Sequence, residues 1–141
     1  MIRRAQLSDV GEMADCVEAA YASAKLQGIA LPPVSEGLDR DIHDHLVWVF
    51  VDSNLIEGMI VVAVEGDQAH LVNIAVHPRA GGKGVAKSLI NTALAELSGQ
   101  QVSRINLATH VDMPANVALY THLGWLETAR TDNKVYISRH L

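Results

Sequence analysis

The amino-acid sequence predicts an α/β (α+β) fold, in which helices flank a mixed, mainly antiparallel sheet of six to seven strands. Two observations predict it. Three runs rich in Val and Ile follow one another across short turns, which is typical of an antiparallel meander. A segment with helical apolar spacing then separates the third run from a further one, and such a crossover makes its flanking strands parallel when they share a sheet. The 141 residues fit one domain, residues 1–141.

The N-terminal segment is expected to form a short strand, a helix and a loop. Ile2 to Ala5 make the strand, and Ser8 or Asp9 caps the helix, with Glu12 completing a variant of the capping box. The helix ends where the segment from Gly28 to Asp41 begins. That segment is predicted to be a loop because it is rich in proline and glycine.

The next part of the chain contains the predicted meander. Its strands are rich in Val and Ile and are bounded by turn residues; they are Leu46–Asp52, Asn54–Gly66 and Ala69–Val76. Pro78 ends the third strand, because proline has no N–H group to donate to a sheet.

The C-terminal half is predicted to contain two helices and three strands. They are the helix Val85–Leu97, the strand Arg104–His110, the helix Pro114–Gly124 and the strands Trp125–Ala129 and Val135–Ser138. The first of these helices provides the crossover that makes the strands on either side of it parallel.

Composition narrows the function classes. The formal net charge of −5 argues against binding to nucleic acid, and the longest apolar run, Met59–Val64, is too short to cross a membrane. Cys16 is the only cysteine, so no internal disulfide is possible, and a cytoplasmic location is expected. His43 and His45 have no evident third ligand, so no metal site is predicted.

The stretch "VHPRAGGKGVAKSL" places three glycines and a lysine at the start of a helix. A helix N-terminus presents unpaired N–H groups, and glycines let an anion approach them closely, so this segment is a candidate phosphate site. A P-loop is excluded because Lys83 is followed by Gly84 and because His77 occupies the place of the first glycine. A dinucleotide fingerprint is a poor match because Lys87 occupies its last glycine position.

Two motifs resemble those of the GCN5-related N-acetyltransferase (GNAT) superfamily. "NIAVHPRAGGKGVAKSLI" resembles the acetyl-CoA-binding segment of that family, and "NVALYTHLGW" resembles its Y-x-x-x-G-[F/W] signature through Tyr120, Gly124 and Trp125. The resemblance covers Ala69 to Trp125. It implies the GNAT fold with about four helices, and acetyl-CoA as a co-substrate.

The resemblance also assigns residues to the binding of acetyl-CoA. The strand end would hold the thioester, the glycine turn would hold the pyrophosphate, and the signature helix would contribute further contacts. The residues so implied are Ile74, Ala75, Val76, Arg79, Gly81, Gly82, Lys83, Gly84, Val85, Ala86, Asn116 and Tyr120. In the favoured frame, Gly81 occupies a position where the family has Gln or Arg, and Arg79 is a candidate substitute. Asn116 stands one helical turn before Tyr120, whereas the family often has an asparagine where Met113 stands here.

The same resemblance implies two catalytic residues. Tyr120 would protonate the departing thiolate, because tyrosine stays protonated at neutral pH; a core aromatic on an amphipathic helix is the alternative. His70 is the candidate base for the acceptor amine, because its pKa is ordinarily near neutrality. His110, Asp112, Glu65 and a water molecule are the other candidates for that base.

The predicted function is N-acetyl transfer to a primary amine of a small molecule or peptide, by direct attack in a ternary complex. The acids of the predicted loop, Glu36, Asp39 and Asp41, would suit a cationic amine, although solvated loop acids are the alternative. A non-catalytic acyl-CoA sensor or structural subunit of the same fold is the other function class. A homodimer is possible, and no nucleic acid or membrane partner is expected.

Overall fold

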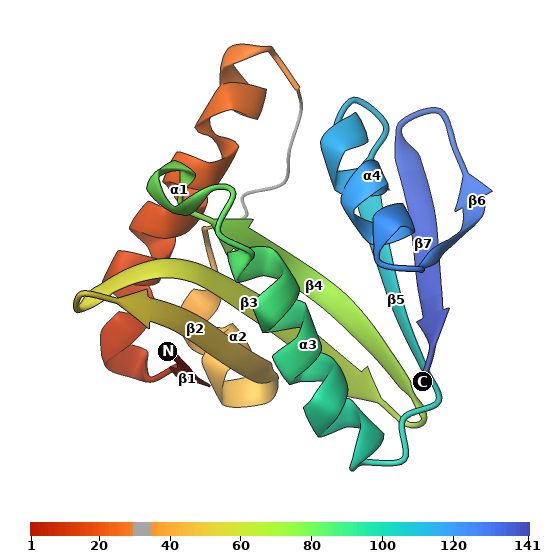
Figure 1. Cartoon of the computed structure of the whole chain (residues 1–141), viewed down its shortest axis with the longest axis horizontal. Coiled ribbons are helices and arrows are strands. Elements are labelled where there is room, and N and C mark those ends of the chain that lie inside the picture. Colours follow the sequence, from red (N-terminus) through yellow and green to blue (C-terminus); the bar gives the residue numbers. More distant parts are fainter. Residues whose placement is uncertain (30–34) are drawn as a thin grey trace.

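A computed structural model provides the structure of the chain, which is described for residues 1–29 and 35–141. Within them, seven strands form one sheet in the order β1-β2-β3-β4-β5-β7-β6 (Figure 1). The strands are β1 (Ile2–Arg4), β2 (Leu46–Asp52), β3 (Leu55–Glu65), β4 (Gln68–Val76), β5 (Arg104–His110), β6 (Leu126–Arg130) and β7 (Lys134–His140). The α-helices are α1 (Val10–Leu26), α2 (Leu38–Asp44), α3 (Val85–Ser98) and α4 (Pro114–His122). The predicted fold class is confirmed.

The crossover through α3 makes β4 and β5 parallel, as the sequence predicts, while the other neighbouring strands are antiparallel. The parallel pairing is short: it runs from Gln68, opposite Arg104, to His70, opposite Asn106. Beyond these pairs β4 and β5 diverge (Figure 1). A register shift between Val61 and Val62 of β3 marks a bulge in β4 at the start of the diverging part.

The helices cover both faces of the sheet and form two apolar clusters. On one face, α1 and α2 bury Met13, Val17 and Leu38 against β2 and β3. On the other face, α3 packs against β3 and β4, and its cluster continues to Tyr120 of α4 and to Trp125. The diverging ends of β4 and β5 therefore open between two separately packed layers.

Helix α2 corrects the prediction that the whole segment from Gly28 to Asp41 is a loop. Residues 30–34, which include both prolines of this segment, lie outside the described residues. Gly37, with φ 75°, precedes the helix, and Asp39 and Asp41 lie in its first turn. Carboxylates there interact favourably with the helix dipole and so stabilise a helix in a segment whose glycine and proline content predicts a loop. Leu38 supplies the buried contact.

The start of α1 differs from the predicted capping box. Asp9 is the N-cap residue but makes no side-chain cap hydrogen bond to α1. Its carboxylate instead accepts hydrogen bonds from the Arg3 guanidinium and from the Gln6 N–H group. Glu12 accepts the N–H of Ile56 in β3. Both acids thus attach the start of the helix to the sheet. Local residue spacing does not predict the contact of Glu12, because Ile56 is distant from the helix in the sequence.

Candidate active site

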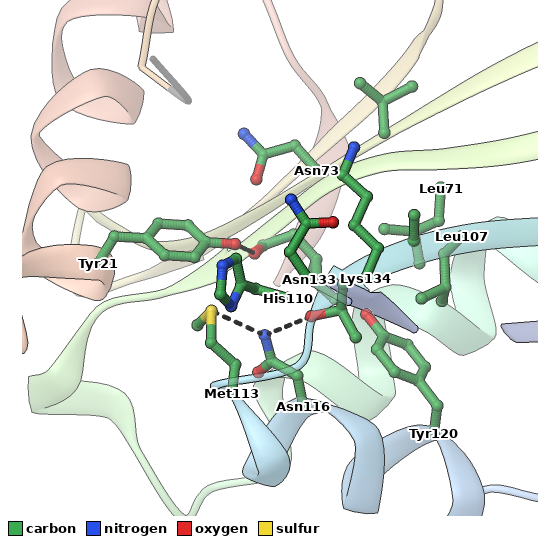
Figure 2. Close-up of a pocket in the computed structure, with 14 residues that line it drawn as sticks. Tyr21, Leu71, Asn73, Leu107, His110, Met113, Asn116, Tyr120, Asn133 and Lys134 are labelled. Atoms are coloured by element: carbon green, nitrogen blue, oxygen red, sulfur yellow. Dashed lines mark hydrogen bonds between the residues drawn. The ribbon is translucent and has the colours of Figure 1, made fainter. Parts of the chain in front are cut away.

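A cavity of about 210 Å³ opens between β4 and β5 where the two strands diverge (Figure 2). Both strands contribute residues that follow their last paired positions. The remaining residues come from α1, from α4 with the residue preceding it, and from the start of β7 with the residue preceding it. The lining residues are Tyr21, Leu71, Val72, Asn73, Ile74, Leu107, Ala108, Thr109, His110, Met113, Asn116, Tyr120, Asn133 and Lys134.

The alternation of side chains along β5 divides this cavity between the two faces of the sheet. Leu107 belongs to the apolar cluster of α3 and α4, so Thr109 lies on that face as well. Asn116 of α4 donates a hydrogen bond of 3.4 Å from Nδ2 to Thr109 Oγ1. Ala108 and His110 therefore lie on the opposite face, toward α1. The cavity passes through the gap between the strands and connects the two faces.

Tyr120 lies on the α4 side of the gap and is 3% exposed. Its ring contacts that of Trp125, with centroids 5.2 Å apart. Figure 2 shows its hydroxyl group directed into the pocket. Burial raises the pKa of Tyr120 well above the usual range of tyrosine, and Tyr21 adds to the shift. The phenol is therefore protonated at neutral pH and is able to donate a proton into the gap.

Tyr21 of α1 lies on the other side of the gap. Its hydroxyl donates a hydrogen bond of 3.1 Å to the main-chain carbonyl of Ile74, on β4. Burial raises the pKa of Tyr21, so this donor also stays protonated at neutral pH. From the sequence, Tyr21 is expected only on the apolar face of a helix. Its position at the fourth turn of α1 gives no local signal that its hydroxyl reaches β4.

His110 is brought into the pocket, whereas the predicted base His70 is not. His70 is exposed and lies in the part of β4 that is still paired with β5, where it is opposite Asn106. His70 therefore does not line the cavity, because the gap begins beyond it, and its role as the base stays a prediction. Glu65 is also remote: it ends β3 in the turn before β4 and is exposed.

The Nδ1 atom of His110 accepts a hydrogen bond of 3.0 Å from the main-chain N–H of Asp112. Neutral His110 therefore carries its hydrogen on Nε2, which makes that atom a donor. The Asp112 carboxylate lies 3.5 Å from Nδ1, and 64% of this side chain is exposed. Asp112 thus orients His110 and does not line the cavity.

The glycine turn before α3 adopts the conformation that its sequence requires. Gly82 and Gly84 have φ values of 78° and 74°, in the left-handed region that favours glycine. Among the described residues, none accepts a hydrogen bond from the N–H groups of residues 82–87. Lys83 is exposed beside them. The turn therefore offers several N–H donors and a cation to an anion, outside the cavity but at the helix that follows β4.

Arg79, the candidate substitute for the missing side chain at Gly81, is hydrogen-bonded to β3. Its Nε donates a hydrogen bond of 2.8 Å to Glu57, and its Nη2 donates one of 3.1 Å to the carbonyl of Ile56. The guanidinium is thus held against β3. Gly81 itself is extended, with φ −62°, and a Cβ atom there would lie 3.3 Å from the Pro78 carbonyl oxygen.

The structure thus separates the predicted binding residues into two groups. Ile74, Asn116 and Tyr120 line the cavity. The others belong to the end of β4, to the turn and to the first residues of α3, and do not line it: Ala75, Val76, Arg79, Gly81, Gly82, Lys83, Gly84, Val85 and Ala86. Several further lining residues were not predicted from the sequence, and the polar ones among them are Tyr21, Asn73, Thr109, Asn133 and Lys134. The pairing of β7 with β5, which places Lys134 at the pocket, has no signal in local pattern.

Comparison with known proteins gives one family. Residues 17–125 match the family described as Acetyltransferase (GNAT) family. No curated protein matches the sequence. Within the part of the chain that the structure describes, no helix is long and apolar enough to cross a membrane.

Several solved structures have the same fold. The PaiA N-acetyltransferase from Thermoplasma acidophilum, solved with coenzyme A, is 15% identical with a TM-score of 0.90, covering 100% of this chain and 98% of its own. The ribosomal-protein-S18-alanine N-acetyltransferase from Escherichia coli is 20% identical, with a TM-score of 0.84. The match covers 99% of this chain and 92% of that protein. An aminoglycoside 6'-N-acetyltransferase, also solved with coenzyme A, is 12% identical, with a TM-score of 0.79. The match covers 99% of this chain and 96% of that protein.

Proposed function

This chain belongs to the acetyltransferase (GNAT) family, and from that premise we propose that it transfers the acetyl group of acetyl-CoA to a primary amine of a small molecule or peptide. One observation carries the proposal. The Tyr120 hydroxyl is buried, protonated and directed into a gap that opens only where β4 and β5 separate. A thioester in this gap would have its sulfur near a proton donor.

Two parts of the chain suit the two ends of acetyl-CoA. The N–H groups of the turn at Gly82 and Gly84, together with Lys83, provide a site for the pyrophosphate. Asn116 and Ile74 line the gap in which the thioester would lie. Coenzyme A bound to two of the structural neighbours is consistent with this use of the fold.

In the proposed reaction, the neutral amine attacks the carbonyl carbon of the thioester directly. The new C–N bond forms and the C–S bond breaks. Tyr120 donates its proton to the departing sulfur and recovers one from solvent, while the nitrogen loses a proton. The acid role is favoured by the burial that keeps the Tyr120 phenol protonated.

Water is the base that we propose for the proton lost by the amine. Among the described residues that line the cavity, none is Asp or Glu. Of those same described residues, His110 is the one histidine, but its Nδ1 is already an acceptor for the Asp112 N–H. A water molecule in the gap could pass the proton to solvent without either group.

The test compares wild type with Tyr120→Phe. Calorimetric titration with acetyl-CoA measures binding, and thiol release over a panel of primary amines measures turnover. Tyr120→Phe is expected to keep its affinity for acetyl-CoA and to lose roughly 10²-fold or more in kcat, the usual contribution of a general acid. Tyr136→Phe, which removes a hydroxyl from the half-exposed Tyr136 on β7, is the control. An unchanged kcat in Tyr120→Phe would refute the acid role.

The same measurements separate the enzyme from a non-catalytic relative. Binding of acetyl-CoA by wild type, with no thiol release across the whole amine panel, would identify an acyl-CoA sensor or structural subunit instead. Lack of any binding would refute both functions. Thermal shift with acetyl-CoA gives an independent measure of binding, because a ligand that binds only the folded chain raises Tm.

A further inference from the structure

The α1 side of the cavity is basic. Lys134 begins β7 and lies directly opposite His110 of β5 in the antiparallel register. Directly opposite residues share a face of the sheet, so both side chains lie on the face toward α1, away from Tyr120. Figure 2 shows His110 next to Tyr21, and Asn133 between Tyr21 and Lys134.

The Lys134 ammonium group has no counter-ion within the part of the chain that the structure describes. No carboxylate of the described residues pairs with it, and none lines the cavity. The nearby acids in the sequence are Asp112, which is directed at His110, and Asp132, which is exposed in the turn before Lys134. The main chain of Lys134 is held in place, because its N–H donates a hydrogen bond of 3.1 Å to Thr131 Oγ1, and its exposed side chain lines the cavity.

Most of the polar groups on this side are hydrogen-bond donors. Lys134 supplies three N–H donors, the Asn133 amide supplies two, and neutral His110 supplies Nε2–H. A carboxylate is the acceptor-only group that matches such a set, and hydrogen bonds to a charged group are the stronger kind. An ammonium group here would be repelled by Lys134 and would meet few acceptors.

We propose that the acceptor is a small amino acid or a similar compound, with a primary amine and a carboxylate in one molecule, and that Lys134 binds its carboxylate. The inference rests on the proposed function and names its substrate class. A volume of about 210 Å³ suits a small acceptor beside the acetyl end of the donor. Lys134 also favours the neutral, nucleophilic form of the amine, because a nearby cation lowers the pKa of an amine.

This inference replaces the cationic acceptor that the predicted loop acids suggested. Asp39 and Asp41 belong to α2, on the α1 side of the sheet, and neither lines the cavity. Glu36 is exposed before that helix and does not line it either. None of these three described acids is therefore placed to bind an ammonium group in the pocket.

The test uses acceptors in matched pairs, each an amino acid and its carboxamide, with kcat/KM measured for both. The ratio of kcat/KM for the amino acid to kcat/KM for its carboxamide is measured in wild type and in Lys134→Gln. Comparing the ratio between the two proteins cancels the difference in intrinsic reactivity between the two amines. Loss of a charged hydrogen-bond partner is expected to lower the ratio about tenfold or more. Lys134→Arg should retain most of the preference. The KM for acetyl-CoA should not change.

Arg139→Gln is the matched control, because it removes one positive charge from the same strand at an exposed position outside the pocket. Its acid-to-amide ratio should equal that of wild type. Transfer to amines with the same ratio in wild type and Lys134→Gln would overturn the inference and leave the proposed function intact. No transfer to any member of either series would overturn the proposed function, and this inference with it.

Discussion

The hydroxyl of Tyr21 donates a 3.1 Å hydrogen bond to the main-chain carbonyl of Ile74. These two residues are 53 positions apart in the sequence, and their contact connects α1 to the diverging part of β4. Ile74 lies beyond the last residue of β4 that pairs with β5. The bond therefore holds the β4 side of the gap in place. It thus links the width of the gap to the position of α1.

Tyr21→Phe should lower Tm by a few degrees. Loss of one partly buried hydrogen bond costs about 1 kcal/mol, which corresponds to roughly 2–4 °C for a domain near this size. Because the Ile74 carbonyl is then free to shift, kcat should fall together with stability. Thermal melts and initial rates with a fixed amine measure both. Tyr136→Phe serves as the comparison, and an identical Tm in Tyr21→Phe would show that the bond contributes nothing.

Gly58→Ala should destabilise the fold and weaken the binding of acetyl-CoA. A Cβ atom at Gly58 would lie 2.8 Å from Val85 Cγ1 and 3.2 Å from Leu89 Cδ1, both in α3. The first turn of α3 would have to move away from the sheet, at a cost of about 1–3 kcal/mol. Chemical denaturation and calorimetry with acetyl-CoA test the two effects.

Gly11→Ala is the control for that variant. Gly11 lies in α1, and a Cβ atom added there would have no described atom within 4 Å beyond its own helix backbone and chain neighbours. Alanine there should stabilise the chain by about 0.5–1 kcal/mol, because alanine has the higher helix propensity. A Gly58→Ala chain as stable as wild type would mean that α3 shifts without cost and that Gly58 is not required for its close approach to the sheet.

Gly84→Ala should weaken acetyl-CoA binding more than it destabilises the chain. Gly84 has φ 74° at the start of α3, and an L-residue in this conformation costs roughly 1–2 kcal/mol. Relief of that strain would turn the N–H groups of the turn away from a bound anion. Gly66→Ala provides the same strain, at φ 63°, in the turn between β3 and β4. Both variants should lose similar stability, and only Gly84→Ala should show a higher Kd.

The sequence predicts the elements of this fold well and the site less well, for a physical reason. Apolar spacing determines which face of a helix or strand is buried, so the helices α1, α3 and α4 and the strands other than β6, which is exposed at all five positions, follow from it. Helix α2 does not follow from apolar spacing, because its first turn is rich in acids and its segment has the composition of a loop. The acids stabilise the helix through its dipole. The bounds of the predicted elements agree with the structure to within two residues because turns at glycine and proline are local signals, although β7 is longer than the predicted strand Val135–Ser138.

The pocket depends on register and on where strands separate, which are long-range properties. His70 and His110 are both strand histidines with similar local surroundings in the sequence. Only the end of the parallel pairing at His70 distinguishes them, because His110 extends beyond it. Lys134 becomes a pocket residue through its pairing opposite His110. The resemblance that identified Tyr120 supplied what local pattern could not.

Asp9→Asn should remove an acid-sensitive part of the stability. Asp9 accepts hydrogen bonds of 2.8 and 3.0 Å from the Arg3 guanidinium, which, with the Gln6 N–H, holds its pKa below the usual value despite burial. A carboxyl group whose pKa is lower in the folded chain than in the unfolded chain stabilises the fold at pH values above the unfolded pKa of about 3.9. This contribution is lost as the pH falls through the folded-state pKa. Because 35% of the Arg3 side chain is exposed and water screens the pair, we expect about 1–2 kcal/mol.

The measurement is the free energy of unfolding of wild type and Asp9→Asn, obtained by urea denaturation at a series of pH values. The difference should be constant between about pH 5 and 7 and should shrink below about pH 4, where Asp9 takes up a proton in the unfolded chain first. Glu127→Gln, which breaks the exposed pair with Arg130 on β6, should change stability little at any pH. A difference for Asp9→Asn that stays constant down to about pH 2 would show that the lost stability comes from packing and not from the charge of Asp9.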